Sequence, residues 1–229
     1  LVDPIKYMIG KYELNYNILN LPNLKKEENS LEKIYDPNNS AYTAAALRNH
    51  IDLPYYEIAP GYQFLHCLIN DATGGESVAL DGFRVASYMK ENFTEYFKIL
   101  LDTPVKFVNR DYTANTIRVM HKPIFTLDHN NDFNDIRFSV AYMGIMDCSP
   151  EVMDSFYEAY RKLLSLLHDP MFEINFRLEA GDIFSFNNRR VLHGRKEYDA
   201  NSGNRHLQGY YIDRDEIVGR LNYLNRINP

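Results

Sequence analysis

Tryptophan is absent from this 229-residue chain, and cysteine occurs only twice, at Cys67 and Cys148. Two isolated cysteines do not have the spacing of a zinc site, and their apolar surroundings favour buried, reduced thiols in a cytoplasmic protein. A disulfide between the two is the alternative. No apolar run approaches the roughly 20 residues that cross a bilayer, so we expect no membrane segment.

Basic residues are also scarce, since 25 Lys and Arg stand against 31 Asp and Glu and give a net charge of -6. Nucleic-acid binding requires a concentrated basic surface, so this balance argues against a nucleic-acid partner. The one basic cluster, residues 189–196, brackets His193. We therefore expect it to serve an anionic small molecule.

Periodicity predicts a mainly β protein with flanking helices. Short alternating segments, separated by Gly, Pro, Asn and Asp turns, indicate strands at 62–69, 78–80, 172–178, 183–186 and 206–212. Asp81 is a candidate N-cap for helices that end before Pro104, and Ser149 with Pro150 begins a helix up to about residue 167. A last helix follows Asp213. We expect one domain over 1–229, with an irregular lead-in over 1–37.

His50 and Asp52 form a candidate metal clamp. In an extended backbone, residues two apart point to the same side, which brings an imidazole and a carboxylate together. Iron(II) held by two His and one carboxylate keeps three positions open, so a distant His must complete the set, and His193 is our candidate. The His-x-Asp spacing alone arises often by chance, and a core or surface His is the plain alternative.

Seven stretches, two of which contain the candidate metal ligands, occur in an order typical of one enzyme group. They are Asn39–Thr43, His50–Tyr55, Pro60–Cys67, Thr73–Ser77, Asp81–Phe83, Val191–Arg195 and Arg205–Tyr211. Taken together they resemble the iron(II) and 2-oxoglutarate dependent oxygenases, and within these the γ-butyrobetaine and trimethyllysine hydroxylase branch. The resemblance runs from about Asn38 to the C-terminus.

The resemblance implies a double-stranded β-helix, a jelly-roll-like core whose mouth holds iron(II). It makes His50, Asp52 and His193 the metal ligands and catalytic set. It also makes Arg205 the partner of the distal 2-oxoglutarate carboxylate, with Ser77 beside it. A planar two-pronged donor suits a buried carboxylate better than Lys does.

Alternatives remain for these co-substrate residues. Arg195 is the second candidate for the carboxylate. Arg205 could instead be a surface residue paired with Asp199 or Glu197, and Ser77 could be an ordinary turn hydroxyl.

The substrate is expected to be a small quaternary ammonium compound such as γ-butyrobetaine or a related betaine. A trimethylammonium group has no hydrogen-bond donor, so its site uses the faces of aromatic rings. By the resemblance, Tyr42 and Tyr211 form such a cage, Asn39 is a polar neighbour, and Tyr16 is a weaker third wall. With 18 Tyr in the chain, ordinary half-buried residues are the alternative.

Departures from the branch concern the substrate more than the reaction. Ile51 replaces a usual Thr, Arg189 replaces a usual Trp, and the branch's N-terminal zinc domain has no counterpart within residues 1–229. What precedes Leu1 is left open, as is assembly, where a homodimer is one alternative.

The expected reaction uses O₂ and couples 2-oxoglutarate decarboxylation to hydroxylation of a C–H bond. The rival functions are a catalytically silent ligand-binding β-sandwich and an oxygenase acting on an amino acid or a protein lysine.

Overall fold

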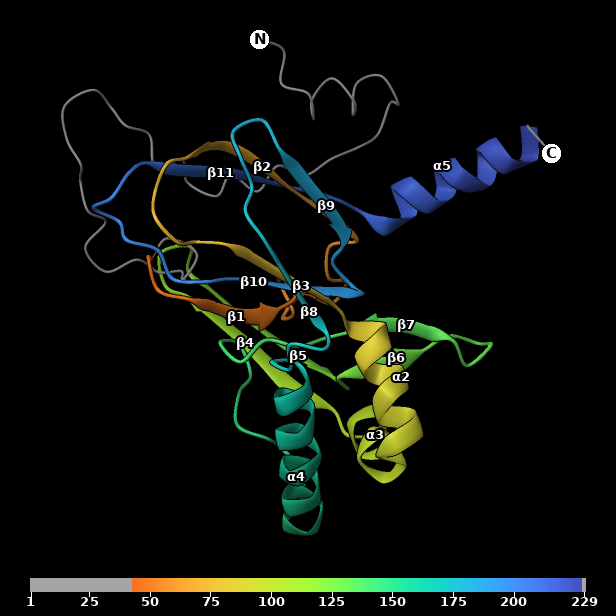
Figure 1. Cartoon of the computed structure of the whole chain (residues 1–229). Coiled ribbons are helices and arrows are strands. Elements are labelled where there is room, and N and C mark those ends of the chain that lie inside the picture. Colours follow the sequence, from red (N-terminus) through yellow and green to blue (C-terminus); the bar gives the residue numbers. More distant parts are fainter. Residues whose placement is uncertain (1–42, 228–229) are drawn as a thin grey trace.

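The computed structural model describes residues 43–227, which form short strands with helices gathered mainly on one side (Figure 1). The strands are β1 (Leu47–His50), β2 (Tyr62–Asn70), β3 (Ser77–Asp81), β4 (Val105–Asp111), β5 (Thr116–Lys122), β6 (Phe125–Leu127), β7 (Phe133–Ile136), β8 (Glu173–Phe176), β9 (Ile183–Asn187), β10 (Val191–Arg195) and β11 (Arg205–Ile212). The helices are α2 (Gly82–Asn92), α3 (Thr94–Asp102), α4 (Pro150–Leu166) and α5 (Arg214–Ile227). The expected mainly β fold with flanking helices is confirmed.

Two antiparallel sheets carry the functional part of the molecule. One has the strand order β1-β10-β3-β8 and the other β11-β2-β9, while β4-β5 and β6-β7 are separate hairpins. The first two sheets face each other across aromatic contacts. The rings of Phe176 and Phe184 lie 4.9 Å apart, and those of Phe186 and His193 lie 4.8 Å apart. The inner faces of both sheets therefore meet around His193.

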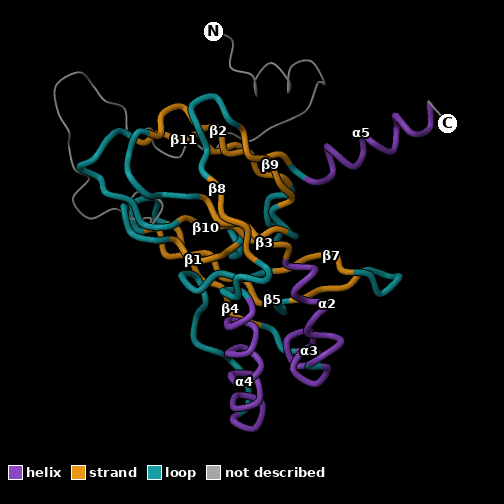
Figure 2. Tube along the Cα trace, viewed as in Figure 1, coloured by secondary structure: helices purple, strands orange, loops and turns teal. Residues whose placement is uncertain are grey.

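Helices α2, α3 and α4 lie beyond the other face of the four-stranded sheet (Figure 2). Their apolar residues join Leu80 of β3 and Leu192 of β10 in one buried core. Because side chains alternate along a strand, Leu192 points into this core while His193 points to the opposite face. This alternation places His193 in the space between the two sheets.

Local signals located several helix boundaries correctly. The side chain of Asp81 accepts a hydrogen bond from the N–H of Phe83, as expected for an N-cap. Pro150 occupies the first turn of α4, directly after Ser149. The helical segment before Pro104 is divided into α2 and α3 at Phe93.

Two expectations need correction. The segment 172–178 was expected to be a regular half-buried strand, but only Glu173–Phe176 is a strand and Ile174 is 61% exposed. The reason is that β8 lies at the edge of its sheet in the described part of the chain, with a strand neighbour, β3, on one side only. Cys67 and Cys148 are both free thiols, as expected, and the disulfide alternative is wrong; Cys67 is buried, but Cys148 is only half-buried. Within residues 43–227, no helix has the length and apolar character needed to cross a membrane.

Candidate metal centre

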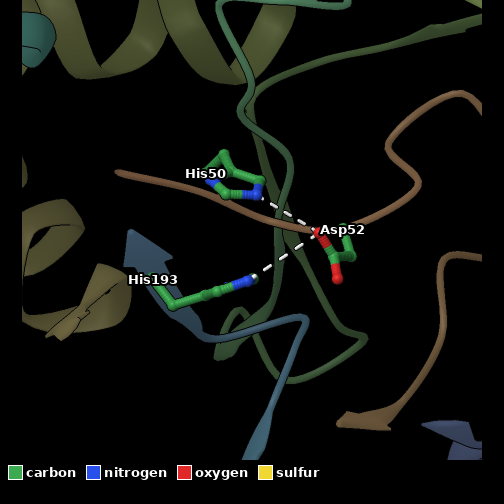
Figure 3. A group of neighbouring side chains, drawn as sticks. All are labelled: His50, Asp52 and His193. Atoms are coloured by element: carbon green, nitrogen blue, oxygen red, sulfur yellow. Dashed lines mark ion pairs between the residues drawn. The ribbon is translucent and has the colours of Figure 1, made fainter. Parts of the chain in front are cut away.

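His50, Asp52 and His193 converge between the two sheets (Figure 3). His50 ends β1 and lies directly opposite His193 on the antiparallel neighbour β10. Their rings lie 4.5 Å apart. Asp52 follows in a bend, and its Oδ1 lies 3.2 Å from His50 Nε2 and 3.8 Å from His193 Nε2. Sequence reasoning therefore selected three side chains that the fold does bring together.

The intervening residue, Ile51, has the opposite orientation. Its side chain is fully buried in the apolar core, and its N–H donates to the carbonyl oxygen of Phe138 at 2.9 Å. The side chain at this position therefore packs into the core and away from the two neighbouring ligands.

The hydrogen bonding of His50 determines which of its nitrogens can bind a metal. Its Nδ1 lies 2.7 Å from the carbonyl oxygen of Arg48, so Nδ1 carries a proton, and Nε2 is the nitrogen that faces Asp52 and would bind a metal. Burial is the largest influence and acts to lower the pKa of His50. The hydrogen bond and the negative charge of Asp52, together with the backbone of Arg48 and His193, outweigh burial and hold the pKa above its ordinary value.

His193 is held neutral. Burial, followed by the neighbouring His50, lowers the pKa of His193 to about 3. A metal ligand must be deprotonated before it binds, so this imidazole is ready at neutral pH. Its Nδ1 is buried and has no hydrogen-bond partner among residues 43–227.

Asp52 is anchored at its side chain and at its backbone. Oδ2 accepts hydrogen bonds from the hydroxyl of Tyr211 and from Nε2 of Gln63, the latter at 2.7 Å. Asn188 accepts from the N–H of Asp52 at 2.9 Å and donates to its carbonyl oxygen at 3.1 Å. Burial acts to raise the pKa of Asp52, but His193, His50 and Tyr211 outweigh it and hold the pKa well below its usual range.

These three side chains fit a divalent metal. Their candidate ligand atoms all lie within 4.8 Å of one another. Ligands at about 2.1 Å from an octahedral ion lie roughly 3 Å apart when they are neighbours, so small side-chain adjustments suffice. Two imidazoles and one carboxylate on one face are also the donor set of non-haem iron(II) oxygenases.

Arg195 and Arg205 gather next to this centre. Arg195 shares a strand face with His193 and pairs in register with Ser77, whose side chain is buried. The guanidinium carbons of Arg195 and Arg205 lie 4.9 and 5.4 Å from the centre of the Tyr198 ring. Burial and then Arg205 lower the pKa of Arg195 to about 10. The two cationic groups therefore share one partly buried region.

The two arginines differ in how they are bound. Nη2 of Arg195 donates to the carbonyl oxygens of Thr43 and Ala45, at 2.5 and 2.7 Å. Nε of Arg205 is buried without a hydrogen-bond partner among residues 43–227, and no ion pair with Asp199 or Glu197 is found there. Part of the Arg195 guanidinium is therefore already bound to the backbone, which favours Arg205 as the group that receives a ligand carboxylate.

Gly75 makes room for Arg205. Its φ is +74°, and a Cβ there would lie 3.3 Å from Arg205 Nε and 3.2 Å from Tyr198 Cβ. A side chain at this position would strain the turn and crowd the guanidinium.

Of the expected aromatic cage, only Tyr211 lies within the described residues; Tyr16, Asn39 and Tyr42 lie outside them. Tyr211 is 5% exposed and adjoins Asp52 through its hydroxyl. Burial and then Asp52 raise the pKa of Tyr211 well above its ordinary value, so the hydroxyl stays a donor. Tyr55 and Tyr142, whose rings lie 4.7 Å apart, also surround this region.

Comparison with known protein families identifies the group. Residues 19–211 match the model of "Taurine catabolism dioxygenase TauD, TfdA family". The chain belongs to the TauD/TfdA family. This match includes all three candidate metal ligands and both arginines.

Similar proteins include γ-butyrobetaine dioxygenases and trimethyllysine dioxygenases. The chain is 40% identical over 191 residues to the γ-butyrobetaine dioxygenase of Pseudomonas sp. (strain AK-1), covering 83% of this chain and 49% of the relative. It is 36% identical to the human enzyme of that name, covering 83% and 50%. A trimethyllysine dioxygenase of Meyerozyma guilliermondii is 32% identical, covering 82% and 47%. The chain thus spans about half the length of these relatives.

Solved structures show the same fold. Asparagine oxygenase, in a complex with Fe(II), 2S,3S-3-hydroxyasparagine and succinate, superposes with a TM-score of 0.60 at 20% identity, covering 75% of this chain and 51% of that one. AAD-2 with Mn(II) and N-oxalylglycine gives 0.58 at 15% identity, covering 72% and 67%. At these identities the likeness concerns the fold alone.

Sequence reasoning missed the anchors of Asp52. Gln63 is a buried polar residue at the second position of β2, and Asn188 follows β9 and is fully buried. The local signal was weak, a glutamine between two aromatic residues of β2, and the contacts of Gln63 and Asn188 with Asp52 span 11 and 136 positions along the chain.

Proposed function

We propose that this chain is the catalytic part of an iron(II) and 2-oxoglutarate dependent hydroxylase of a small quaternary ammonium compound, such as γ-butyrobetaine or a related betaine. The observation that carries the proposal is the convergence of His50, Asp52 and His193 on one site between two sheets. Membership of the TauD/TfdA family supports the same chemistry.

In this proposal His50, Asp52 and His193 hold Fe(II). The bound iron supplies the one-electron and O₂ chemistry that amino-acid side chains lack. The chain contributes the ligands, orients the substrate and excludes water. The burial of His193 and Tyr211 supports the exclusion of water.

Arg205 is proposed to bind the distal carboxylate of 2-oxoglutarate, with Ser77 and Arg195 beside it. Residues two apart on a strand project from the same face about 7 Å from each other. His193 and Arg195 have this relationship on β10. A five-carbon dicarboxylate can therefore reach from the metal to the arginines, and the unpartnered Nε of Arg205 supports this placement.

The proposed substrate site uses tyrosine rings to bind the quaternary ammonium group. Tyr211 borders the metal ligand Asp52, and Tyr55 and Tyr142 extend the aromatic surface. Tyr42 and Tyr16, with Asn39 as a polar neighbour, remain proposals from sequence. The names of the relatives, γ-butyrobetaine and trimethyllysine dioxygenase, support a trimethylammonium substrate.

We also propose that residues 1–229 form one catalytic domain with a double-stranded β-helix core. The two facing antiparallel sheets and the solved structures of similar fold support this core. The proposed partners are O₂ and a small molecule, without nucleic acid or membrane, in the cytoplasm. A homodimer is the assembly to test by light scattering.

Turnover of 2-oxoglutarate tests the function. We would measure succinate formation with γ-butyrobetaine, trimethyllysine, a trimethylaminoalkyl phosphonate and the matching primary amines. The expected result is faster succinate formation with a methylated compound than with its primary amine. Equal rates would contradict the betaine assignment and favour an amino acid or protein lysine as substrate. Absence of iron binding in anaerobic metal analysis would favour the silent ligand-binding protein.

A further inference from the structure

The two oxygens of Asp52 have different surroundings. Oδ1 faces the Nε2 atoms of His50 and His193, at 3.2 and 3.8 Å. Oδ2 instead accepts hydrogen bonds from Gln63 Nε2 and from the Tyr211 hydroxyl. Gln63 is 1% exposed and Tyr211 is 5% exposed, so both donors are shielded from water. One carboxylate oxygen is thus directed to the metal position, and the other is bound to protein donors.

The donors of Oδ2 come from adjacent strands of one sheet. Gln63 on β2 and Tyr211 on β11 lie directly opposite each other in the antiparallel register. The histidines belong to the other sheet, on β1 and β10. Because β2 is the middle strand of its sheet, with β11 and β9 on its two sides, the position of Gln63 is fixed by neighbours on both flanks.

The amide orientation of Gln63 is fixed by charge. An ionised carboxylate accepts hydrogen bonds but donates none, so only the NH₂ side of the amide can face Oδ2. The amide oxygen, Oε1, is buried and has no hydrogen-bond partner among residues 43–227. The side chain of Gln63 thus donates from Nε2 to Asp52, while its Oε1 accepts no hydrogen bond from the described residues.

This arrangement matters for the number of open positions on a bound metal. Carboxylates bind metals through one oxygen or through two. With two His and one carboxylate oxygen, an octahedral ion keeps three open positions, and a second carboxylate oxygen would remove one of them. A chelating co-substrate takes two positions, so a two-oxygen Asp would leave none for O₂.

We propose that Gln63 is a positioning residue that restricts Asp52 to ligation through one oxygen, with the Tyr211 hydroxyl as the second donor to Oδ2. This proposal rests on the metal site proposed above. Gln63 would thus limit how many coordination positions Asp52 occupies on the ion, without itself contacting the ion.

Water relaxation on bound Mn(II) tests the proposal. The variant Gln63→Met keeps the side-chain size and removes the donor, and Gln208→Met makes the same change on β11, where Gln208 accepts a hydrogen bond from Tyr210. At saturating Mn(II), we expect the water proton relaxation per bound ion to fall by about a third in Gln63→Met, because three open positions become two. The dissociation constant of N-oxalylglycine should rise by about tenfold or more. Gln208→Met should leave both values unchanged.

Unchanged relaxation per bound Mn(II) in Gln63→Met, or an equal fall in Gln208→Met, would overturn the proposal. If Gln63→Met does not fold, Tyr211→Phe replaces it, since it removes the other donor and keeps the ring; relaxation should then fall in the same direction. Failure of the unmodified protein to bind Mn(II) would instead contradict the metal site itself. The two failures are therefore distinguishable.

Discussion

Asn188 holds the peptide of Asp52 from both sides, although 136 residues separate them in the chain. Its side-chain oxygen accepts from the N–H of Asp52, and its amide donates to the carbonyl oxygens of Asp52 and Pro60, at 3.1 and 3.2 Å. The side chain of Asn188 therefore replaces the strand partner that the bend after β1 lacks. Directly after Asp52, Leu53 has a φ of 55°, so the bend depends on these bonds.

Replacing Asn188 should destabilise this bend. In Asn188→Leu the backbone groups of Asp52 lose their partners while buried, and we expect the free energy of unfolding to fall by about 2–4 kcal/mol. Urea unfolding of the metal-free protein measures this change. The exposed Asn92 provides the control, since Asn92→Leu should change stability by less than about 0.5 kcal/mol. Equal free energies of unfolding for Asn188→Leu and Asn92→Leu would show that the hydrogen bonds of Asn188 do not support the bend.

Removing one metal ligand should abolish metal-dependent stabilisation. We expect that Mn(II) no longer raises the melting temperature of His193→Ala, because a site with two ligands binds the ion far more weakly. The matched control is His121→Ala on the exposed side of β5, which should respond to Mn(II) as the unmodified protein does. His50→Ala and Asp52→Ala should behave like His193→Ala. Normal succinate formation by His193→Ala would exclude this residue as a ligand.

Arg205→Lys should weaken 2-oxoglutarate binding while leaving Mn(II) affinity nearly unchanged. A point charge cannot reproduce a two-pronged guanidinium, and the loss should be about 1.5–3 kcal/mol, roughly 10- to 150-fold in the dissociation constant. Calorimetric titration of the Mn(II)-loaded protein with 2-oxoglutarate measures it. If Arg195→Lys weakens binding while Arg205→Lys does not, the carboxylate belongs to Arg195.

The aromatic cage predicts a ring-dependent preference for methylated substrates. Tyr211→Leu removes the ring, and a cation–π contact contributes about 0.5–2 kcal/mol, so the preference for γ-butyrobetaine over its primary amine should fall roughly 2- to 30-fold. Competition between the two compounds for turnover measures the preference. Tyr211→Phe keeps the ring and should keep most of the preference. An unchanged preference in Tyr211→Leu would remove this residue from the cage.

Arg137 should be important for stability near the metal centre. It is 3% exposed, lies 3.6 Å from Asp135, and donates to the carbonyl oxygens of Pro54 and Tyr56 at 2.6 Å each. Arg137→Met should lower the free energy of unfolding by about 3–5 kcal/mol, because it leaves a buried carboxylate with a weaker partner set. Urea unfolding tests this, and Asp135→Asn added to Arg137→Met should recover part of the loss.

The parts of the fold that depend on local chemistry could be predicted from sequence. The capping carboxylate of Asp81 acts within two residues, and Pro150 restricts its own backbone. Burial could not be predicted in the same way. The apolar alternation around Ile174 was correct as a strand signal, but its exposure depends on the edge position of β8, which no local pattern encodes.

In the candidate site, too, local features could be predicted from sequence and long-range contacts could not. The pair His50 and Asp52 was accessible from a two-residue spacing. The ligand number that iron(II) requires called for one more distant His, and the family resemblance of Val191–Arg195 selected His193. The contacts that orient Asp52 were not accessible, because the Tyr211 hydroxyl reaches it from 159 residues away. The resemblance of Tyr211 to the branch indicated an aromatic wall of the substrate site. Its hydrogen bond to Asp52 emerges only from the pairing of β11 with β2.

Among residues 43–227, the four-residue strand β1 has one strand neighbour, β10, and its pairing is irregular between Leu47 and His50. Edge strands with so few bonds open locally more easily than the strands they border. A bound ion would tie the last residue of this edge strand to the adjacent interior strand. It follows that metal loading should slow amide hydrogen exchange at residues 47–50 more than elsewhere in the sheet, and that the fraying of β1 sets how long the ion stays bound.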